Sequence, residues 1–582
     1  MAKQWLLAPP LPDEYIEQFP EQNRLVLQLL YNRGIAPNNV EHFLQPEYAN
    51  LYSPFLFQEM ELAANRIWEA IEKKEKIYIY GDYDADAVTA NAVLQQTFRY
   101  LRVEASSYIP DRFSEGYGLN VEAFKKLKAD GAQVVITVDC GTNSVAEAEF
   151  CRANGIDLII TDHHEITGAT PAAFALVNPK NPADLYPDNQ ITGVGVAYKL
   201  AVALLSNQTK VCAAKGILEH EYVPEWDKWL LDLVAIGTVA DVHSLLGENR
   251  ILVRFGLKVL QKTKWIGLRQ LMENAGLDRA HDILDTRTLG FVVAPRINAA
   301  GRLEHADIAL NLLISKDYAE AIELSNQMED INRRRKDMTA RIVSEAKSEA
   351  ELILDRRVLM LANENWPKGL VGIVAGKLAD QYKRPVLVLE KGELESTGSA
   401  RSSGDFNIVE CLKVSSHLLV KFGGHKQAAG LTVASENLEI LYQEILRFAD
   451  SQPPSENKQD ILQLEAELSP EELRMETAED IARLEPFGEG NPVPGFMVKD
   501  VELVNFRLVG AKQQHLQLQV RAGETALECI GFNFSYIAGK LTAGVRLDLA
   551  GELITDSWQG MKKLKLKLLD IKVIEYVQNI SN

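Results

Sequence analysis

Three carboxylates at alternate positions, Asp82, Asp84 and Asp86, are the residues whose spacing most directly indicates chemistry. They lie in the segment Gly81 to Ala90, GDYDADAVTA. Because like charges this close repel one another, a cation is needed to offset them, and a divalent metal ion is the natural choice. The same segment could instead be a polar strand-to-helix loop in which one aspartate caps the helix. These ten residues alone leave both interpretations open.

Acids and histidines also follow later apolar runs. They are Asp139 after residues 134–138, Asp162, His163 and His164 after residues 158–161, and Asp241 after residues 233–240. If each run is a strand of one parallel sheet, these side chains meet at one edge of it. Carboxylates with one or two imidazoles favour Mn²⁺ or Mg²⁺ over metals that prefer thiolates. Several shared carboxylates suit two ions about 3.5–4 Å apart, which clamp the attacking and leaving oxygens of a phosphoryl displacement.

The elements that position these residues form an α/β pattern. Ile77 to Tyr80 is an apolar, β-branched and aromatic run typical of a buried strand, and Val88 to Arg102 is predicted to be a helix. Strands and helices alternate from Ile77 onward, which predicts a doubly wound parallel sheet. Residues 229–260 and 283–313 are predicted to be mostly helical. The first acids therefore fall at the carboxyl end of a strand, where α/β sheets bind ligands.

Several domains are expected along the chain. The predicted divisions are a helical lead-in (1–50), a first α/β lobe (51–319), a long connecting helix (320–354), a second, smaller α/β lobe (355–450) and, after a polar proline-bearing linker, a C-terminal domain (461–582). The last domain contains five strand-like segments, which suggest a small β-barrel such as the OB fold.

Composition limits the class of protein. The 582 residues carry a net charge of −19, which argues against a surface coated with nucleic acid but allows a narrow basic groove. We expect no signal peptide in the segment MAKQWLLAPPLP and no membrane span, since the most apolar window, residues 191–205, is short and contains Lys199. The five cysteines form no CxxC pair, which fits a cytoplasmic protein without a zinc site or disulfide framework.

Four motifs resemble those of the DHH phosphoesterase family: GDYDADAVTA, TVDCG (137–141), TDHH (161–164) and GTVAD (237–241). Five more resemble motifs of its bacterial exonucleases specific for single-stranded DNA: YIPDRFSEGYGLN (108–120), APRINAAGRL (294–303), GSARS (398–402), KFGGH (421–425) and LEPFGEGNP (484–492). The resemblance covers about residues 50–575. It implies a DHH domain, a connecting helix, a DHH-associated domain and an OB domain, in that order.

The resemblance implies a metal centre with two ions, Mn²⁺ or Mg²⁺. The implied ligands are Asp82, Asp84, Asp86, Asp139, His163 and Asp241, with Asp82 in or beside the shell and Asp139 and Asp241 as bridging carboxylates. The implied catalytic residues are His164, facing the scissile phosphate as electrostatic stabiliser or proton donor, and Asp86.

The resemblance also implies a DNA-binding groove between the two lobes. Its residues would be Arg112, Arg296, Asn298 and Arg302 from the first lobe, and Ser399, Arg401, Gly423, Gly424 and His425 from the second. Arginine suits phosphate because its planar fork binds two oxygens at once, and paired glycines let backbone amides approach closely. Arg112, Ser399 and Arg401 would bind a 5′-phosphate. Phe532 or Trp558 of the barrel could stack on bases.

Two positions depart from the family pattern. The family usually has glycine where this chain has Ala87, which would be strained by roughly 1 kcal/mol if the backbone there is left-handed. The usual Trp-His of the second lobe is Trp366-Pro367 here, which removes a possible donor. Neither position is a predicted ligand.

The function implied is a metal-dependent 5′→3′ exonuclease that hydrolyses single-stranded DNA to mononucleotides in repair and recombination. Its expected partners are a single-strand-binding protein and a RecQ-type helicase, and we expect a monomer. One alternative is a DHH phosphodiesterase for short RNA or cyclic dinucleotides, against which residues 461–582 argue. Another is a non-catalytic replication scaffold, against which the complete acid and histidine set argues.

A dinucleotide site and ATP hydrolysis are not indicated. The fragment GVGVAY (193–198) resembles part of a dinucleotide fingerprint but lacks its third glycine, and the sequence has no GxxxxGKS/T phosphate loop.

Overall fold

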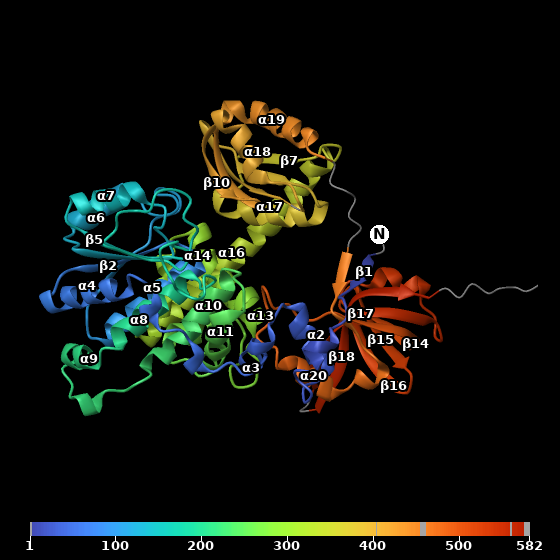
Figure 1. Ribbon diagram of the computed structural model, residues 1–582. Coiled ribbons are helices and arrows are strands. Elements are labelled where there is room, and N and C mark those ends of the chain that lie inside the picture. Colours follow the sequence, from blue (N-terminus) through green and yellow to red (C-terminus); the bar gives the residue numbers. More distant parts are fainter. Residues whose placement is uncertain (1–2, 403, 454–460, 559–560, 575–582) are drawn as a thin grey trace, which may run out of the picture. The chain divides into compact units, whose positions relative to one another are not determined.

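The computed structural model describes residues 3–402, 404–453, 461–558 and 561–574 (Figure 1). The chain forms two compact units, one from residues 53–241 and 256–457 and the other from residues 1–52, 242–255 and 458–582. Of the helices in the described ranges, none combines the length and the apolar character that a membrane span requires.

The first lobe contains the predicted doubly wound sheet. Its strand order is β3-β2-β4-β5-β6, and every pair is parallel: β2 (Ile77–Gly81), β3 (Ser106–Tyr108), β4 (Val134–Val138), β5 (Asp157–Thr161) and β6 (Ala175–Val177). Figure 1 shows helices on both faces: α4 (Met60–Lys73), α5 (Ala85–Tyr100) and α8 (Gly193–Leu205) on one, α6 (Val121–Ala129) and α7 (Val145–Ala153) on the other. Strands β2 and β4 are buried throughout, as expected of a sheet covered on both sides.

Asp241 corrects one prediction. The run before it is the helix α10 (Leu231–Ala240), which agrees with the mostly helical prediction for residues 229–260 but not with the strand end after which Asp241 was placed. Asp241 is the residue at the C-cap of this helix. The helix is buried over most of its length and packs against α5 and α8. An apolar run without polar alternation does not distinguish a buried strand from a buried helix, which is why the sequence misled here.

The rest of this unit is a helical extension of the first lobe followed by the second lobe. The further helices include α9 (Gln208–Lys215), α12 (Ile266–Asn274), α14 (Ala294–Leu303), α15 (Asp307–Ile314) and the predicted long connecting helix α16 (Tyr318–Glu351). Helix α11 (Gly247–Leu260) contributes residues to both units. Helix α16 carries the basic run Arg333-Arg334-Arg335-Lys336. In it, Arg333 pairs with Asp330 on the same helix and Arg334 with Glu304 at the end of α14. These pairs are typical of a solvated helix surface.

The second lobe has a mixed sheet of order β10-β11-β9-β8-β7. Its strands are β7 (Leu359–Asn363), β8 (Val386–Glu390), β9 (Glu395–Arg401), β10 (Leu419–His425) and β11 (Ala428–Ala434), and its helices are α17 (Lys368–Tyr382), α18 (Ile408–Val414) and α19 (Leu438–Ser451). Strands β9 and β10 were not predicted as such along their whole length, because glycine and small polar residues weaken the strand signal.

The other unit contains the barrel. Five strands have the order β14-β15-β16-β18-β17, and a β14–β17 pairing closes the barrel. They are β14 (Phe496–Val509), β15 (His515–Ala522), β16 (Thr525–Gly531), β17 (Arg546–Trp558) and β18 (Met561–Val573). The five-stranded OB-like barrel predicted from the sequence is therefore confirmed.

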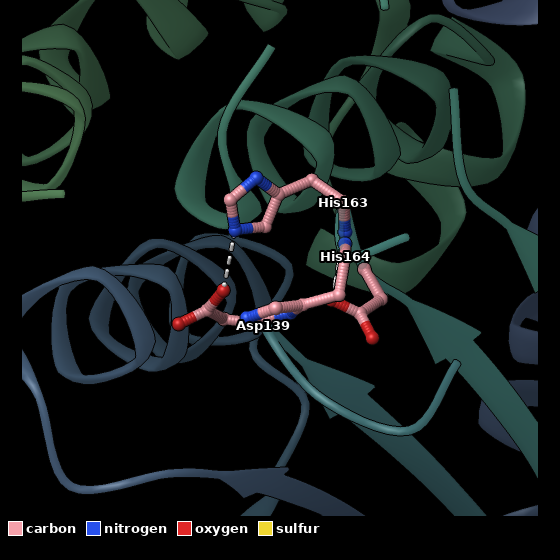
Figure 2. Close-up of side chains that lie close together, drawn as sticks. Asp139, His163 and His164 are labelled. Carbon is pink, nitrogen blue, oxygen red and sulfur yellow. Dashed lines mark hydrogen bonds and ion pairs between the residues drawn. The ribbon is translucent and has the colours of Figure 1, made fainter. Parts of the chain in front are cut away.

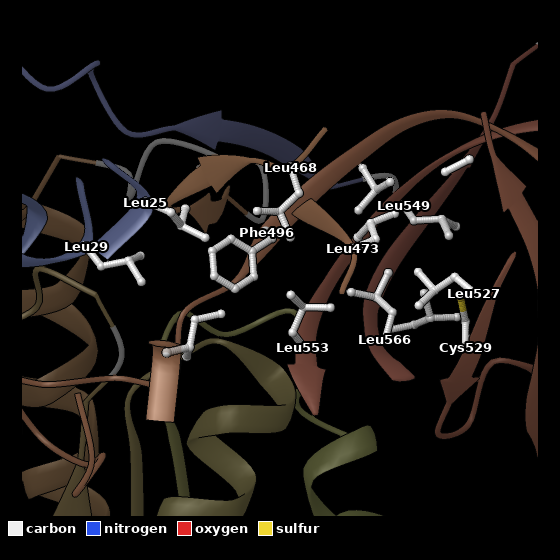
Figure 3. Close-up of a cluster of buried hydrophobic side chains, with 14 of the residues drawn as sticks. Leu25, Leu29, Leu468, Leu473, Phe496, Leu527, Cys529, Leu549, Leu553 and Leu566 are labelled. Atoms are coloured by element: carbon white, nitrogen blue, oxygen red, sulfur yellow. The ribbon is translucent and has the colours of Figure 1, made fainter. Parts of the chain in front are cut away.

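The N-terminal residues share the core of this barrel. β1 (Gln4–Leu7) pairs in parallel with β12 (Ile461–Leu464). Leu25 and Leu29 of α2 (Arg24–Asn32) belong to the same buried cluster as Phe496 and Leu553 of the barrel (Figure 3). The N-terminal segment and the C-terminal domain are thus joined by backbone pairing and by a common apolar core.

The backbone at Ala87 is not left-handed. It lies in the first turn of α5, is fully buried, and is not among the described residues with positive φ. Its N–H donates to Oδ1 of Asp84, the N-cap of the helix, at 3.0 Å. The backbone is helical, so the strained alternative is wrong and alanine is well suited to the position.

The variant Ala87→Gly tests this conclusion. Replacing alanine by glycine in a helix costs about 1 kcal/mol, so we expect a lower melting temperature despite the return to the usual family residue. Thermal unfolding of metal-free wild type and variant measures the difference. A variant more stable than wild type would contradict a helical Ala87.

Candidate metal centre

The acids and His163 come together in space. His163 Nε2 lies 3.0 Å from Asp139 Oδ1, 3.6 Å from Asp241 Oδ2 and 3.9 Å from Asp86 Oδ2. Figure 2 shows the His163 imidazole directed at the Asp139 carboxylate. These four side chains follow β2, β4 and β5 and the helix α10, so the sheet edge predicted from the sequence is joined by a helix end.

Local backbone structure fixes each acid. Asp84 caps α5 through the Ala87 amide, and Asp86 lies in the first turn of that helix. Asp82 is buried at the end of β2, and its Oδ1 accepts the Tyr83 N–H at 2.7 Å. Asp139 has φ 59°, a left-handed conformation that aspartate and asparagine adopt more readily than most residues. Such backbone strain is often found at functional sites.

The electrostatics of the cluster require a cation. Burial and then neighbouring carboxylates raise the pKa of Asp82 to about 7 and that of Asp241 to about 7. The same two causes raise the pKa of Asp86 and Asp139 well above its ordinary value. Ionised together without a counter-charge, these groups would destabilise the fold. Buried carboxylate oxygens with one imidazole are a donor set that fits Mn²⁺ or Mg²⁺.

His164 belongs to a separate pair. Its Nδ1 lies 2.7 Å from Oδ1 of the buried Asp162, which also accepts the backbone N–H groups of His163 and Thr142. Burial lowers the pKa of His164, but the hydrogen bond to Asp162 and the charges of Asp162, Asp241 and Asp84 together outweigh burial and raise the pKa to about 9. His164 is therefore a cation at neutral pH, and the Tyr117 hydroxyl lies 3.4 Å from its Nε2. Asp162 could be found in the sequence from its place beside the histidines. Tyr117 lies in the motif 108–120, but no role was predicted for it.

Three of the predicted arginines lie close enough to influence one another. The Arg302 Nη1 donates to the Gly369 carbonyl of the second lobe at 3.2 Å. Burial and then the charges of Arg112 and other arginines, Arg401 included, lower the pKa of Arg302 to about 10. The Arg112 guanidinium lies over the Tyr83 ring, 4.6 Å from its centre. The charge of Asp84 acts on Arg302 in the opposite direction without reversing this shift. A group of neighbouring cations favours an anionic ligand.

The predicted residues of the second lobe lie on two strands. Ser399 and Arg401 lie on β9, and Arg401 Nη1 donates to Ser399 Oγ at 2.7 Å. Gly423, Gly424 and His425 lie at the exposed end of β10.

Two more predicted groove residues, Arg296 and Asn298, have partners within the first lobe and the helices beside it. Arg296 is 9% exposed and bonds Glu329 at 2.6 Å and the Val292 carbonyl at 2.8 Å. Asn298 accepts the Ala85 N–H at 2.8 Å, which ties α14 to the start of α5. In the barrel, Phe532 is 52% exposed with its ring against His515, whereas the Trp558 side chain lies outside the described residues.

Comparisons with known families agree with this organisation. The DHH family N-terminal domain matches residues 76–238, the DHHA1 domain residues 355–451 and the RecJ OB domain residues 464–570. With the acid and histidine cluster at the sheet edge, these matches define a phosphoesterase of the DHH class.

Two individual relatives show which family within the DHH class the chain resembles. The single-stranded-DNA-specific exonuclease RecJ of Bacillus subtilis (strain 168) is 38% identical over 95% of this chain and 68% of its own length. That of Haemophilus influenzae is 31% identical over 96% of this chain and 97% of its own length. The chain therefore belongs to the RecJ family.

Solved structures agree. The crystal structure of RecJ from Thermus thermophilus in complex with Mn²⁺ matches with a TM-score of 0.81 and 28% identity, covering 98% of this chain and 80% of that one. Its complex with Mg²⁺ matches with a TM-score of 0.75, 26% identity, and coverage of 98% and 79%. Both metals predicted from the donor set are thus found in structures of this family.

The raised pKa values predict how metal and pH affect stability. A carboxyl whose pKa is about 7 when folded and about 4 when unfolded stabilises the protein below pH 4, and this contribution is lost as pH rises through 7. Metal-free protein should therefore melt at a higher temperature at about pH 6 than at about pH 8. Mn²⁺ should raise the melting temperature more at the higher pH, because it replaces the protons.

Two variants test whether the effects of pH and Mn²⁺ on the melting temperature come from the acid cluster. Asp139→Asn should reduce both effects, whereas Glu393→Gln, at an exposed position in the second lobe, should leave them unchanged. Melting that is insensitive to Mn²⁺, or a metal-free protein more stable at the higher pH, would contradict a cation-dependent cluster.

Proposed function

We propose that the chain is a metal-dependent exonuclease that degrades single-stranded DNA from its 5′ end to mononucleotides. The observation that carries the proposal is the convergence of Asp86, Asp139 and Asp241 on His163 in a chain of the RecJ family. With Asp82 and Asp84, this set offers enough ligand atoms for two ions.

Each part of the centre has a chemical task in this proposal. Mn²⁺ or Mg²⁺ held by the five aspartates and His163 would supply Lewis acidity toward a water molecule and the phosphodiester oxygens. His164, kept protonated by Asp162, directs its Nε2 side to the substrate, where it stabilises the negative charge or gives its proton to the leaving 3′-oxygen. Both oxygens of Asp86 accept backbone N–H groups, which hold its carboxylate in one orientation.

The arginine group supports recognition of the 5′ end. A terminal phosphate carries up to two charges and three terminal oxygens, so it needs several convergent donors. Arg401 and Ser399 offer a guanidinium and a hydroxyl on one side of β9, and the charges of Arg112 and Arg401 both act on Arg302. A 5′-phosphate held there at a fixed distance from the metals would set where the strand is cut.

The barrel supports a single-stranded substrate. OB folds bind single strands by stacking bases on aromatic side chains, and Phe532 exposes half of its surface beside His515. This domain also argues against a phosphodiesterase for very short substrates. The intact ligand set argues against a non-catalytic scaffold.

We further propose that the protein is a cytoplasmic monomer. It would act in DNA repair and recombination together with a single-strand-binding protein and a RecQ-type helicase.

Asp139→Asn tests the metal-dependent chemistry. Asparagine is preferred to alanine because it tolerates the left-handed backbone at this position. We expect cleavage of labelled single-stranded DNA to be lost, with the fold retained, because one negative ligand is removed. The control is Asp380→Asn, at an exposed position of α17. Cleavage by Asp139→Asn near the wild-type rate, or by wild type in excess chelator, would refute the proposal.

Arg401→Ala tests recognition of the 5′ end. The variant should bind metal normally but lose the preference for 5′-phosphorylated over 5′-hydroxyl strands, by about 1.5–3 kcal/mol, as for a lost charged hydrogen bond. Initial rates on the two substrates give the preference. Arg447→Ala, an exposed arginine on α19 of the same lobe, should keep it. If Arg401→Ala keeps the wild-type preference for 5′-phosphorylated strands, the 5′-phosphate does not bind at β9.

A further inference from the structure

The helix α8 begins at the acid cluster. The backbone N–H of Gly193 donates to Asp86 Oδ2 and that of Val194 to Asp86 Oδ1, both at 2.9 Å. These N–H groups have no partner within the helix and carry the partial positive charge of its N-terminus. Since a carboxylate has about four acceptor positions, the two bonds fix its plane and leave positions for a metal ion.

Gly193 is needed for reasons of space. A Cβ atom at this position would lie 2.5 Å from both Cβ and Oδ1 of Asp139 and 2.7 Å from its Cγ. Non-bonded carbon atoms prefer a separation of about 3.5–4 Å. The Asp139 side chain therefore occupies the space that any side chain at 193 would need. The backbone of Asp139 is itself left-handed.

A second glycine has the same relation to Asp86. Gly237 lies on α10, and a Cβ atom there would lie 2.7 Å from Asp86 Oδ1 and still closer to Thr89 Oγ1. Two helices thus approach the carboxylates of Asp86 and Asp139 with bare backbone. The arrangement keeps both acids close to each other without a side chain between them.

We propose that Gly193 is a positioning residue of the metal centre. It allows the first turn of α8 to orient the Asp86 carboxylate and allows Asp139 to lie beside it, and so it sets the affinity for the divalent ion. The inference rests on the proposed metal-binding role of Asp86 and Asp139, but not on which substrate is cleaved. The Gly-Val-Gly fragment, which the dinucleotide interpretation could not explain, thereby gains a role.

The direct test is Gly193→Ala in the full chain, with Mn²⁺ binding measured by titration calorimetry and by the electron paramagnetic resonance signal of free Mn²⁺. Changes that disturb the groups orienting metal ligands typically weaken binding 10–100-fold, so we expect a rise in Kd of about that size. Circular dichroism and metal-free melting establish that the variant is folded. Activity at high Mn²⁺ should recover in part, because the ligands themselves remain.

Two other glycines serve as controls. Gly195→Ala lies on the same helix, but its Cβ would lie 2.5 Å from the Ile191 side chain, with Thr192 Oγ1 in ordinary contact at 3.4 Å, and would not meet the acids. It reports the cost of strain in α8 alone and should change stability more than Kd. Gly376→Ala, on α17 of the second lobe, has nothing within 4 Å of its Cβ and should change neither.

A second substitution, Thr192→Ala, tests the inference if Gly193→Ala fails to fold. Thr192 is the N-cap of α8, and its Oγ1 accepts the Gly195 N–H at 3.4 Å. Thr192→Ala loosens the same turn without adding an atom, so Kd for Mn²⁺ should rise several-fold. Its control is Asn120→Ala, which removes the N-cap of α6, where the helix does not bond Asp86.

The outcomes separate this inference from the proposed function. Wild-type Kd for Mn²⁺ in folded Gly193→Ala, or in Thr192→Ala if the former does not fold, would overturn the role of Gly193. Cleavage of single-stranded DNA by the wild type is measured in the same preparations. Weakened Mn²⁺ binding in the variants, with no cleavage by a wild type that binds Mn²⁺, would support the role of Gly193 and refute the exonuclease.

Discussion

Repulsion among buried carboxylates is the constraint on which the rest of the structure depends. Asp86 and Asp139 lie within reach of one imidazole nitrogen and are almost fully buried. Burying a charge is costly unless it is paired, so the surrounding fold must hold these groups together against both desolvation and mutual repulsion. Three features of the fold hold these carboxylates in place: the strand ends, the first turn of α8 and the left-handed backbone of Asp139. A divalent cation completes it.

Charge is also divided between regions of the molecule. The acids gather at the sheet edge, whereas Arg302 lies where burial and the charges of other arginines lower its pKa. In a chain with a net charge of −19, such a group of cations is a local exception. An acidic surface repels a polyanion, whereas a basic region within it attracts the polyanion. The pairing of His164 with Asp162 adds one further cation beside the acids.

Much of the candidate site could be predicted from the sequence because parallel strands bring their carboxyl ends to one edge. That rule placed Asp82, Asp139 and His163 correctly. It failed for Asp241, because a continuous apolar run carries no period that separates a strand from a helix. Contacts between distant segments had no sequence signal at all. The ion pair of Arg296 with Glu329 and the bonds from α8 to Asp86 are of this kind. The helical backbone of Ala87 also had to be observed, since its departure from the family pattern suggested strain.

The most direct measurement of the central claim is anomalous X-ray scattering at the manganese edge from crystals of the wild-type protein grown with Mn²⁺. The account predicts two peaks about 3.5–4 Å apart. Carboxylate oxygens of Asp86, Asp139 and Asp241 and the imidazole of His163 should surround them. A single peak would contradict the two-ion centre. Peaks elsewhere, or none, would contradict the assignment of this cluster as the metal centre.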